Sequence, residues 1–469
     1  MSIFIYDLSF LIIFSLVIAL FLYKEKKKLT KDGWMYLYKT SIGLKVIDYL
    51  GTRNKKLLNF FSYIIVGTGY VLMALMIWLL ATTLKIFFNP ALVQMIKIPP
   101  LMPLIPYLPG LFKVTWLPPF YFTYWIIAIA LIAIFHEGFH GIFARFNNVR
   151  IKSTGWGFLG PFLAFFVEQD DKQMQKKKIF PQLTIISAGV FANVLLGIVF
   201  FFIMVGFFSL AYSPVGVNFD TYSYSVVPLN ALVFTNSTSV SSSGNNYSEV
   251  SYNNQSYLLS PSILNQTHAL NSSLTLVYQV EPAITSDLKG AIININNQST
   301  KSTSDISLIL GKLKPGDSIE VKTKYANPNG TNEVISYSLV LGKDYENESR
   351  AILGVGYLDS KTTGLRGFLN KMFYTFRDSK LLYEPNINPE FTLFIYNLFW
   401  WIVLINFSVA LTNMLPMGIF DGGRFFYLTV LAITKKKKVA EFCFKWVTKL
   451  ILLIFLALML LWAWAIFFK

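Results

Sequence analysis

The sequence predicts a polytopic α-helical membrane protein that carries a β-rich insert, and three observations lead to this fold class. Of its 469 residues, 54% are hydrophobic and 14% are charged, proportions unsuited to soluble domains. Apolar stretches of about 20 residues, the length that crosses a hydrocarbon core of about 30 Å, recur along the chain. Between residues 214 and 386 they give way to a region rich in Ser, Thr and Asn with short strand-like runs.

About six apolar stretches are expected to span the membrane. They cover residues 3–23, 60–88, 121–143, 183–210, 391–415 and 446–468. The first has no positively charged region before it and no small-residue cleavage site after it. We therefore expect it to be a retained helix rather than a signal peptide.

The distribution of basic residues predicts the orientation of these helices. The net charge of +16 alone would fit a nucleic-acid-binding protein, but many lysines form short runs beside apolar stretches. With the N-terminus outside, the basic segments 24–56, 145–178 and 424–445 all face the cytoplasm, as the positive-inside rule requires. We expect an integral protein of the lipid bilayer that binds no nucleic acid, with residues 214–386 on the exoplasmic side.

Two further segments are apolar but broken by Gly and Pro, namely residues 89–120 and 155–167. Neither can form a regular spanning helix. Two interpretations remain open for them: loops that lie along the membrane interface, or backbone folded into the membrane where protein covers it.

The insert is predicted to contain β-strands. Apolar residues recur with period two in residues 274–280, and residues 293–296 and 335–339 repeat this pattern. Residues 214–273 are of low complexity and are expected to be partly disordered, whereas residues 274–357 are expected to form one compact module. The predicted organisation is 1–120 (two spans and the Pro-rich segment), 121–213 (first part of a membrane core), 214–273, 274–386 (the module and a linker) and 387–469 (second part of the core).

The candidate chemistry lies in one apolar stretch. The chain has three His, of which His136 and His140 lie four residues apart with Glu137 directly after the first. On a helix these positions share a face, so both imidazoles reach one Zn²⁺ while Glu137 lies beside the metal-bound water. Zinc lowers the pKa of that water to about 7, and a glutamate then takes its proton as it attacks a carbonyl, which is peptide hydrolysis.

Two considerations favour this interpretation. The single cysteine, Cys443, excludes a cysteine-based metal cage, so nitrogen and oxygen must bind any metal. Ionisable groups inside a span cost about 3 kcal/mol each, which disfavours the alternative that these are polar residues at a helix end, satisfied by water or backbone.

Catalytic zinc usually has three protein ligands, and the sequence offers two candidates for the third. Glu168 follows His140 at a distance similar to that in soluble zinc peptidases with a glutamate ligand, and Asp421 lies just after a span. Spacing alone does not choose between them. Asp421 is physically preferable because Pro and Gly on both sides break the helix and let its side chain turn inward. The alternative for Asp421 is a loop residue that caps a helix beginning near Gly423.

Together, four segments resemble the site-2 protease group of intramembrane metalloproteases. They are His136 to His140 (HEGFH), Ser153-Thr154-Gly155 through Phe165-Phe166-Val167-Glu168, Ser187 to Asn193 (SAGVFAN) and Asn413 to Gly423 (NMLPMGIFDGG). Three residues depart from the family's usual pattern without removing a functional group: Phe165, Val190 and Phe420.

The resemblance implies zinc ligands at His136, His140 and Asp421, a general base at Glu137, and a polar group near the reacting carbonyl at Asn413. It also implies that Glu168 is not a ligand. Its segment is similar to the family's membrane-inserted β-hairpin, whose free edge pairs with an unwound substrate helix. For Asn193, an interhelical hydrogen bond and a substrate contact both remain open.

Part of the insert resembles a PDZ domain, which many members of this group carry here. The stretches that carry the resemblance are residues 287–296, 305–313 and 314–317. Such a module binds an extended peptide or a C-terminus by strand addition. The alternative is a stable β-domain without a peptide ligand.

The leading hypothesis is a zinc peptidase that cleaves single-span membrane proteins within or near the bilayer. From His136 to Arg145 is about 13 Å of helix, which places the site within the bilayer on its cytoplasmic side. One alternative is a catalytically inactive, membrane-anchored binding protein that acts through its PDZ-like insert. The other is a zinc peptidase at the cytoplasmic face with Glu168 as third ligand.

Overall fold

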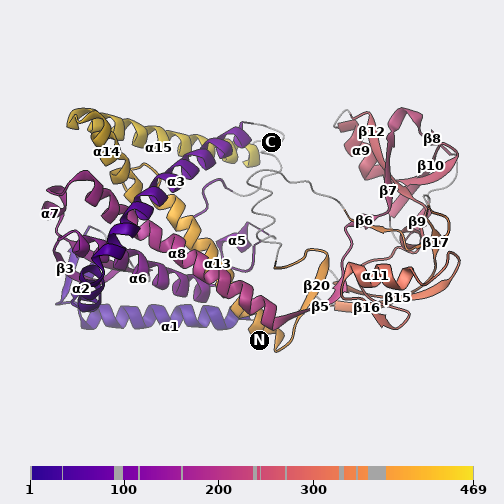
Figure 1. Cartoon of the computed structure of the whole chain (residues 1–469), viewed down its shortest axis with the longest axis horizontal. Helices are drawn as coiled ribbons and strands as arrows, with labels where there is room; N and C mark the ends of the chain where they lie inside the picture. Colours follow the sequence, from indigo (N-terminus) through magenta and orange to yellow (C-terminus); the bar gives the residue numbers. More distant parts are fainter. Residues whose placement is uncertain are drawn as a thin grey trace. The chain divides into compact units, whose positions relative to one another are not determined.

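The structure is a computed structural model of the chain. It describes residues 3–33, 35–88, 99–112, 114, 117–159, 162–235, 240–242, 245–269, 272–326, 332–344, 347–357 and 376–467. The chain divides into two compact units (Figure 1). We call Met1–Met204 with Phe394–Lys469 the membrane unit, and Val205–Leu393 the β unit.

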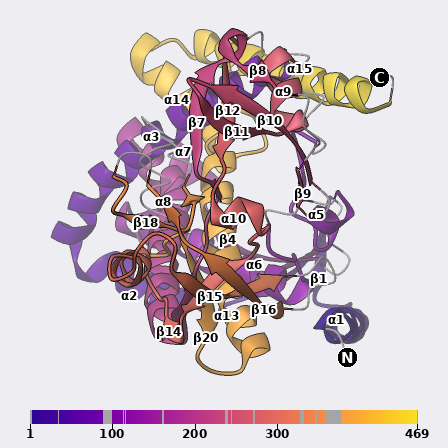
Figure 2. The same cartoon turned by 90° about the vertical axis from the view of Figure 1, so that its right-hand side faces the viewer.

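Six helices among the described residues are long and apolar enough to cross a membrane, which confirms the predicted spans and a multi-pass helical membrane protein. They are α1 (Ile3–Lys24), α3 (Lys55–Phe87), α6 (Phe122–Phe146), α8 (Ile179–Ala211), α13 (Pro389–Asn413) and α15 (Lys437–Phe467). In both views α1 and α15 lie on opposite sides of the membrane unit, with α6 between them (Figures 1 and 2). Exposed leucines such as Leu20 and Leu456 lie on these outer helices, as a lipid-facing surface requires.

Four shorter helices connect the spans: α2 (Leu44–Arg53), α5 (Leu108–Leu111), α7 (Asp171–Gln175) and α14 (Asp421–Thr434). The broken segment 89–120 lies partly outside the described residues, and its described part contains α5 rather than a spanning helix.

A four-stranded antiparallel sheet belongs to the membrane unit. Its order is β1 (Leu29–Asp32), β2 (Met35–Thr40), β3 (Ile151–Leu159) and β4 (Phe162–Gln169). The pair β3–β4 is the hairpin that the resemblance implied, and β4 is an edge strand. The other two strands were not predicted, because they lie in a basic segment without clear alternation. Gly155 is required where β3 pairs with β2, since a Cβ there would overlap the Tyr38 carbonyl.

Helix α1 contains a buried carboxylate that caps another helix. Asp7 is only 4% exposed, and its oxygens accept hydrogen bonds from the Phe122 and Thr123 backbone N–H groups, both at 2.8 Å. The hydroxyls of Tyr107 and Thr123 also donate to it, each at 2.5 Å. Phe122 and Thr123 begin α6, whose N-cap residue Tyr121 supplies no side-chain cap. Asp7 therefore satisfies, from α1, the N–H groups that begin α6.

Replacing Asp7 with Ala is expected to destabilise the membrane unit by about 2–4 kcal/mol, because it leaves buried donors of α6 without an acceptor. The measurement is the unfolding temperature of the detergent-solubilised protein, followed by tryptophan fluorescence. Ser9→Ala is the matched control, since Ser9 is an exposed residue of the same helix that bonds only within its own turn. Equal melting of the two variants would contradict the capping role.

The β unit contains two six-stranded sheets with interleaved strands. The first comprises β7 (Tyr224–Pro228), β12 (Leu274–Gln279), β11 (Gln255–Leu259), β10 (Asn245–Tyr252) and β8 (Val233–Phe234), with β9 (Val240–Ser242) beside β10. The second comprises β16 (Asn332–Val340), β15 (Ser318–Ala326), β13 (Ala291–Ile295), β5 (Tyr212–Val217) and β20 (Leu381–Pro385), with β14 (Gln298–Ser299) beside β13.

Short elements complete the β unit. They are the pairs β17 (Gly342–Lys343) with β18 (Ala351–Ile352) and β6 (Thr221–Tyr222) with β19 (Val355–Gly356), the helices α9 (Pro261–Ala269), α10 (Pro282–Thr285) and α11 (Thr303–Leu310), and the 3₁₀ turn η1 (Leu229–Ala231).

The three predicted strands correspond to β12, β13 and β16. Residues 214–273, expected to be partly disordered, contain β7, β8, β10 and β11 in their described part. The reason is that their few apolar side chains, among them Val227 and Val250, form a small core with Val277 of β12. Strands from both sides of the predicted boundary at residue 273 therefore pair with each other. In the first sheet β7 pairs with β12, and in the second sheet β5, at the start of the insert, pairs with β13.

Glu281, directly before α10, is a buried carboxyl group of the β unit. It is 4% exposed and lies against the backbones of Gly342 and Gly354, where an added Cβ would overlap it. Burial, and secondly the neighbouring charge of Asp344, raises the pKa of Glu281 to about 7.

This raised pKa predicts a pH-dependent stability of the β unit. A carboxyl group whose pKa is higher in the folded state stabilises below its unfolded pKa, and that stability is lost as pH rises through the folded value. Exchange protection around β17 and β19 is therefore expected to fall between about pH 4.5 and pH 7. The measurement is hydrogen exchange corrected for its intrinsic pH dependence. Glu281→Gln should abolish the change, and an unaltered profile in that variant would contradict the assignment.

Candidate metal centre

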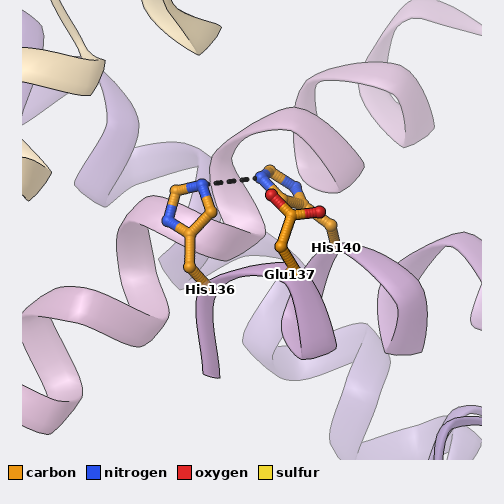
Figure 3. A group of neighbouring side chains, drawn as sticks. All are labelled: His136, Glu137 and His140. Carbon is orange, nitrogen blue, oxygen red and sulfur yellow. Dashed lines mark hydrogen bonds between the residues drawn. The ribbon is translucent and has the colours of Figure 1, made fainter. Parts of the chain in front are cut away.

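Helix α6 presents the two histidines and the glutamate of the sequence motif side by side (Figure 3). The Nε2 atoms of His136 and His140 are 3.0 Å apart, and both rings are buried. The ligand atoms of His136, Glu137 and His140 all lie within 4.8 Å of one another. The i, i+4 spacing therefore places both imidazoles on one face, as expected.

Helix α8 fixes the orientation of both rings. His140 Nδ1 lies 2.7 Å from the Ile185 carbonyl oxygen, which only accepts, so Nδ1 carries the proton and Nε2 is available as a ligand atom. The side-chain amide of Asn193 lies 3.1 Å from His136 Nδ1, and for Nε2 to serve as a ligand atom the amide oxygen must be the atom that accepts from Nδ1–H. Of the two possibilities for Asn193, the structure thus contains the interhelical hydrogen bond, and its partner is a residue of the motif.

Gly189 of α8 leaves the space in front of the two Nε2 atoms open. A Cβ at this position would lie 2.7 Å from His136 Nε2 and would overlap His140 Nε2. The glycine falls in one of the segments that carry the family resemblance, but sequence reasoning gave it no role. The available signal was the run of small residues Ser187-Ala188-Gly189 in an otherwise bulky spanning helix.

Asp421 approaches the same two nitrogen atoms from α14. Its Oδ2 atom is 3.3 Å from His136 Nε2 and 3.4 Å from His140 Nε2. Gly422 and Gly423 allow this approach, since a Cβ at either would overlap the backbone of the preceding loop at Met414 or Met417. The N-cap of α14 is Phe420, and it provides no side-chain cap, so Asp421 occupies the first helical turn rather than a capping position.

The three ligand atoms fit a zinc ion. Their separations of 3.0, 3.3 and 3.4 Å are close to the edges of about 3.3–3.4 Å in a tetrahedron with bonds of about 2.0–2.1 Å. Two neutral imidazoles and one carboxylate are a donor set that zinc accepts, and three protein ligands would leave a fourth position for water or substrate.

Glu137 is bound to the edge strand of the small sheet. Its Oε2 atom accepts a hydrogen bond of 3.2 Å from the Val167 N–H of β4. Glu137, His140 and Asp421 line one cavity of about 320 Å³ together with Val167. The candidate base, two of the candidate ligands and a strand edge therefore meet at the same cavity.

Two other predicted site residues are placed differently. The Glu168 carboxylate accepts hydrogen bonds of 2.7 Å from both Lys39 Nζ and Ser153 Oγ, and among the described residues it has no hydrogen bond or ion pair with either motif histidine. Asn413 is the half-buried last residue of α13. In the described part of the chain its side chain has no hydrogen bond to the motif residues or Asp421.

A His-Glu-His group inside a bundle of six apolar helices defines a multi-pass membrane metallopeptidase. The chain matches the model of peptidase family M50 over residues 124–460 and belongs to this family, that of the site-2 proteases. None of the curated proteins matches it. The resemblance is thus confirmed. Because the HExxH-type site is intact, the hypothesis of an inactive binding protein is not supported.

Proposed function

We propose that this protein is an intramembrane zinc metalloprotease that hydrolyses peptide bonds of single-span transmembrane substrates. The observation that carries the proposal is the arrangement of His136 Nε2, His140 Nε2 and Asp421 Oδ2 within 3.0–3.4 Å of one another, beside Glu137. These groups lie on and against a helix apolar enough to span a membrane.

In this mechanism His136, His140 and Asp421 would hold the zinc ion. When bound, zinc would supply a Lewis acid that lowers the pKa of a water molecule in the site to about 7. Glu137 accepts the proton from the attacking water and delivers it to the leaving amine. Asn193 and the Ile185 carbonyl keep the imidazoles oriented. Asn413 is assigned to the reacting carbonyl by the resemblance alone.

Strand β4 is proposed to receive the substrate. A helical substrate hides its amides, so a segment must unwind before water attacks it. An edge strand offers unpaired N–H and C=O groups to such a segment. In support, β4 is the last strand of its sheet, and its Val167 N–H already points to the base.

In this proposal the site lies within the bilayer on its cytoplasmic side and the β unit is exoplasmic, as the positive-inside rule indicates. In the β unit, a cavity of about 390 Å³ lies between α11 and the residues of β18 and β19. We propose that this cavity binds an extended peptide or a C-terminus, as the PDZ-like stretches imply.

The experiment measures zinc content and cleavage of a model single-span substrate by the purified protein. A chelator should stop cleavage and added zinc should restore it. Asp421→Asn is expected to lose both zinc and cleavage, whereas Glu168→Gln keeps its zinc. The reverse result would support the alternative in which Glu168 is the third ligand. Failure of the zinc-loaded wild type to cleave any membrane substrate would overturn the proposal.

A further inference from the structure

The cavity at the metal centre contains more negative than positive groups. Of its described lining residues, Arg424 is the single Arg or Lys. The carboxylates that line the same cavity are Glu137, Glu168, Asp171 and Asp421. Two of these carboxylates already have cationic or histidine partners, since Glu168 is bound by Lys39 and Asp421 faces the histidines. Arg424 is therefore the lining cation best placed to receive a further anion.

Arg424 lies close to the candidate catalytic groups because it belongs to the same helix, α14, as Asp421. It follows Asp421 by three residues, so the two side chains share a helix face about one turn apart. Its side chain is 38% exposed, and its Nη1 atom pairs with Asp171 Oδ1 at 3.2 Å. Asp171 is 70% exposed. An ion pair this exposed is weak, so another carboxylate can replace Asp171 at modest cost.

The proposed reaction makes such a carboxylate in this cavity. Water adds to the scissile carbonyl, the C–N bond breaks, one proton goes through Glu137 to the leaving amine, and the acid formed on the other fragment ionises. Once it leaves the zinc, the new carboxylate lies beside the Glu137 carboxylate, which repels it. A guanidinium matches a carboxylate with two parallel N–H donors.

We propose that Arg424 binds the newly formed C-terminal carboxylate of the product, with Asp171 as its resting partner and competitor. This inference rests on the proposed peptide hydrolysis. Exchange of Asp171 for the product draws the new carboxylate away from the acidic catalytic groups, toward the exposed side of the cavity where Asp171 lies. Arg424 is thus a product-binding residue.

A purely structural role would make the same ion pair a tether between α14 and α7. The two roles differ in what removal of each partner does. A tether is broken equally by Arg424→Gln and by Asp171→Asn. A product site loses its cation in the first variant but loses only its competitor in the second, so the two variants should shift product affinity in opposite directions.

The test measures binding of two fluorescent peptides that match the N-terminal cleavage product, one ending in a carboxylate and one in a carboxamide. The protein carries Glu137→Gln to prevent turnover and is examined with zinc and after chelation. Chelation removes any direct binding of the carboxylate to zinc. Arg424→Gln is expected to weaken carboxylate-peptide binding about tenfold in both states and to leave the carboxamide peptide unchanged.

Asp171→Asn is expected to strengthen binding of the carboxylate peptide roughly threefold. Arg424→Lys should retain part of the preference, because it keeps the charge without the paired donors. Equal losses for both peptides in Arg424→Gln, or parallel losses in the two ion-pair variants, would overturn the inference in favour of a tether. An unchanged preference for the carboxylate would also overturn it.

These outcomes separate this inference from the proposed function. Absence of cleavage in the zinc-loaded wild type, with the carboxylate preference present, would refute proteolysis but not an anion site at Arg424. Cleavage by the wild type without any dependence of product binding on Arg424 would refute this inference alone.

Discussion

Glu137→Gln is expected to lower cleavage of a transmembrane substrate by about 10³-fold or more while leaving zinc bound. Glutamine has the same shape as glutamate, and its amide oxygen still accepts the Val167 N–H, so the surroundings of the site are kept. It cannot take a proton from the attacking water. The proposed ligand atoms of His136, His140 and Asp421 are unaltered.

The measurement pairs single-turnover cleavage with the zinc content of the same preparation. Ser9→Ala, which changes an exposed residue of α1, controls for effects of mutation and handling. Loss of zinc together with activity would mean that Glu137 is a ligand. Retained activity would mean that another group serves as the base.

Gly189→Ala is expected to reduce zinc affinity by about 100-fold and to reduce cleavage in proportion. The added methyl group would occupy the space in front of the two Nε2 atoms, 2.7 Å from that of His136. Two spanning helices would have to separate to admit it, and overpacking of this kind costs about 1–3 kcal/mol before any metal is bound.

Gly206→Ala is the matched control, since it makes the same substitution in α8 at a position where a Cβ meets nothing within 4 Å. Zinc titration and cleavage should be unchanged in this variant. If Gly189→Ala bound zinc as tightly as the control, the metal would have to lie elsewhere than between the histidines and Asp421.

Features set by local sequence were predictable. The six spans follow from continuous apolar runs whose length matches the bilayer, and the pairing of His136 with His140 follows from helical periodicity alone. The family match over residues 124–460 confirms the reaction class inferred from these residues.

Features that depend on contacts between distant segments were not predictable in the same way. The approach of Asp421 to the histidines depends on Gly422 and Gly423 packing against a loop, and spacing alone left Glu168 as an equal candidate. The strands β1 and β2 have little alternation and gain their order by pairing with β3. Asp7 stood out in the sequence only as an interruption of an apolar run.

The hydrogen bonds of Asp7 have a consequence for how the chain assembles during synthesis. Its partners Tyr107 and Thr123 follow it by 100 and 116 residues. The first helix therefore enters the membrane before the residues that donate hydrogen bonds to its carboxyl group have been synthesised. A helix with an unpaired carboxyl group is poorly tolerated in lipid by itself. Its stable docking must wait for the start of α6. The helix that carries the peptidase motif is thus also the one that completes the insertion of the N-terminus.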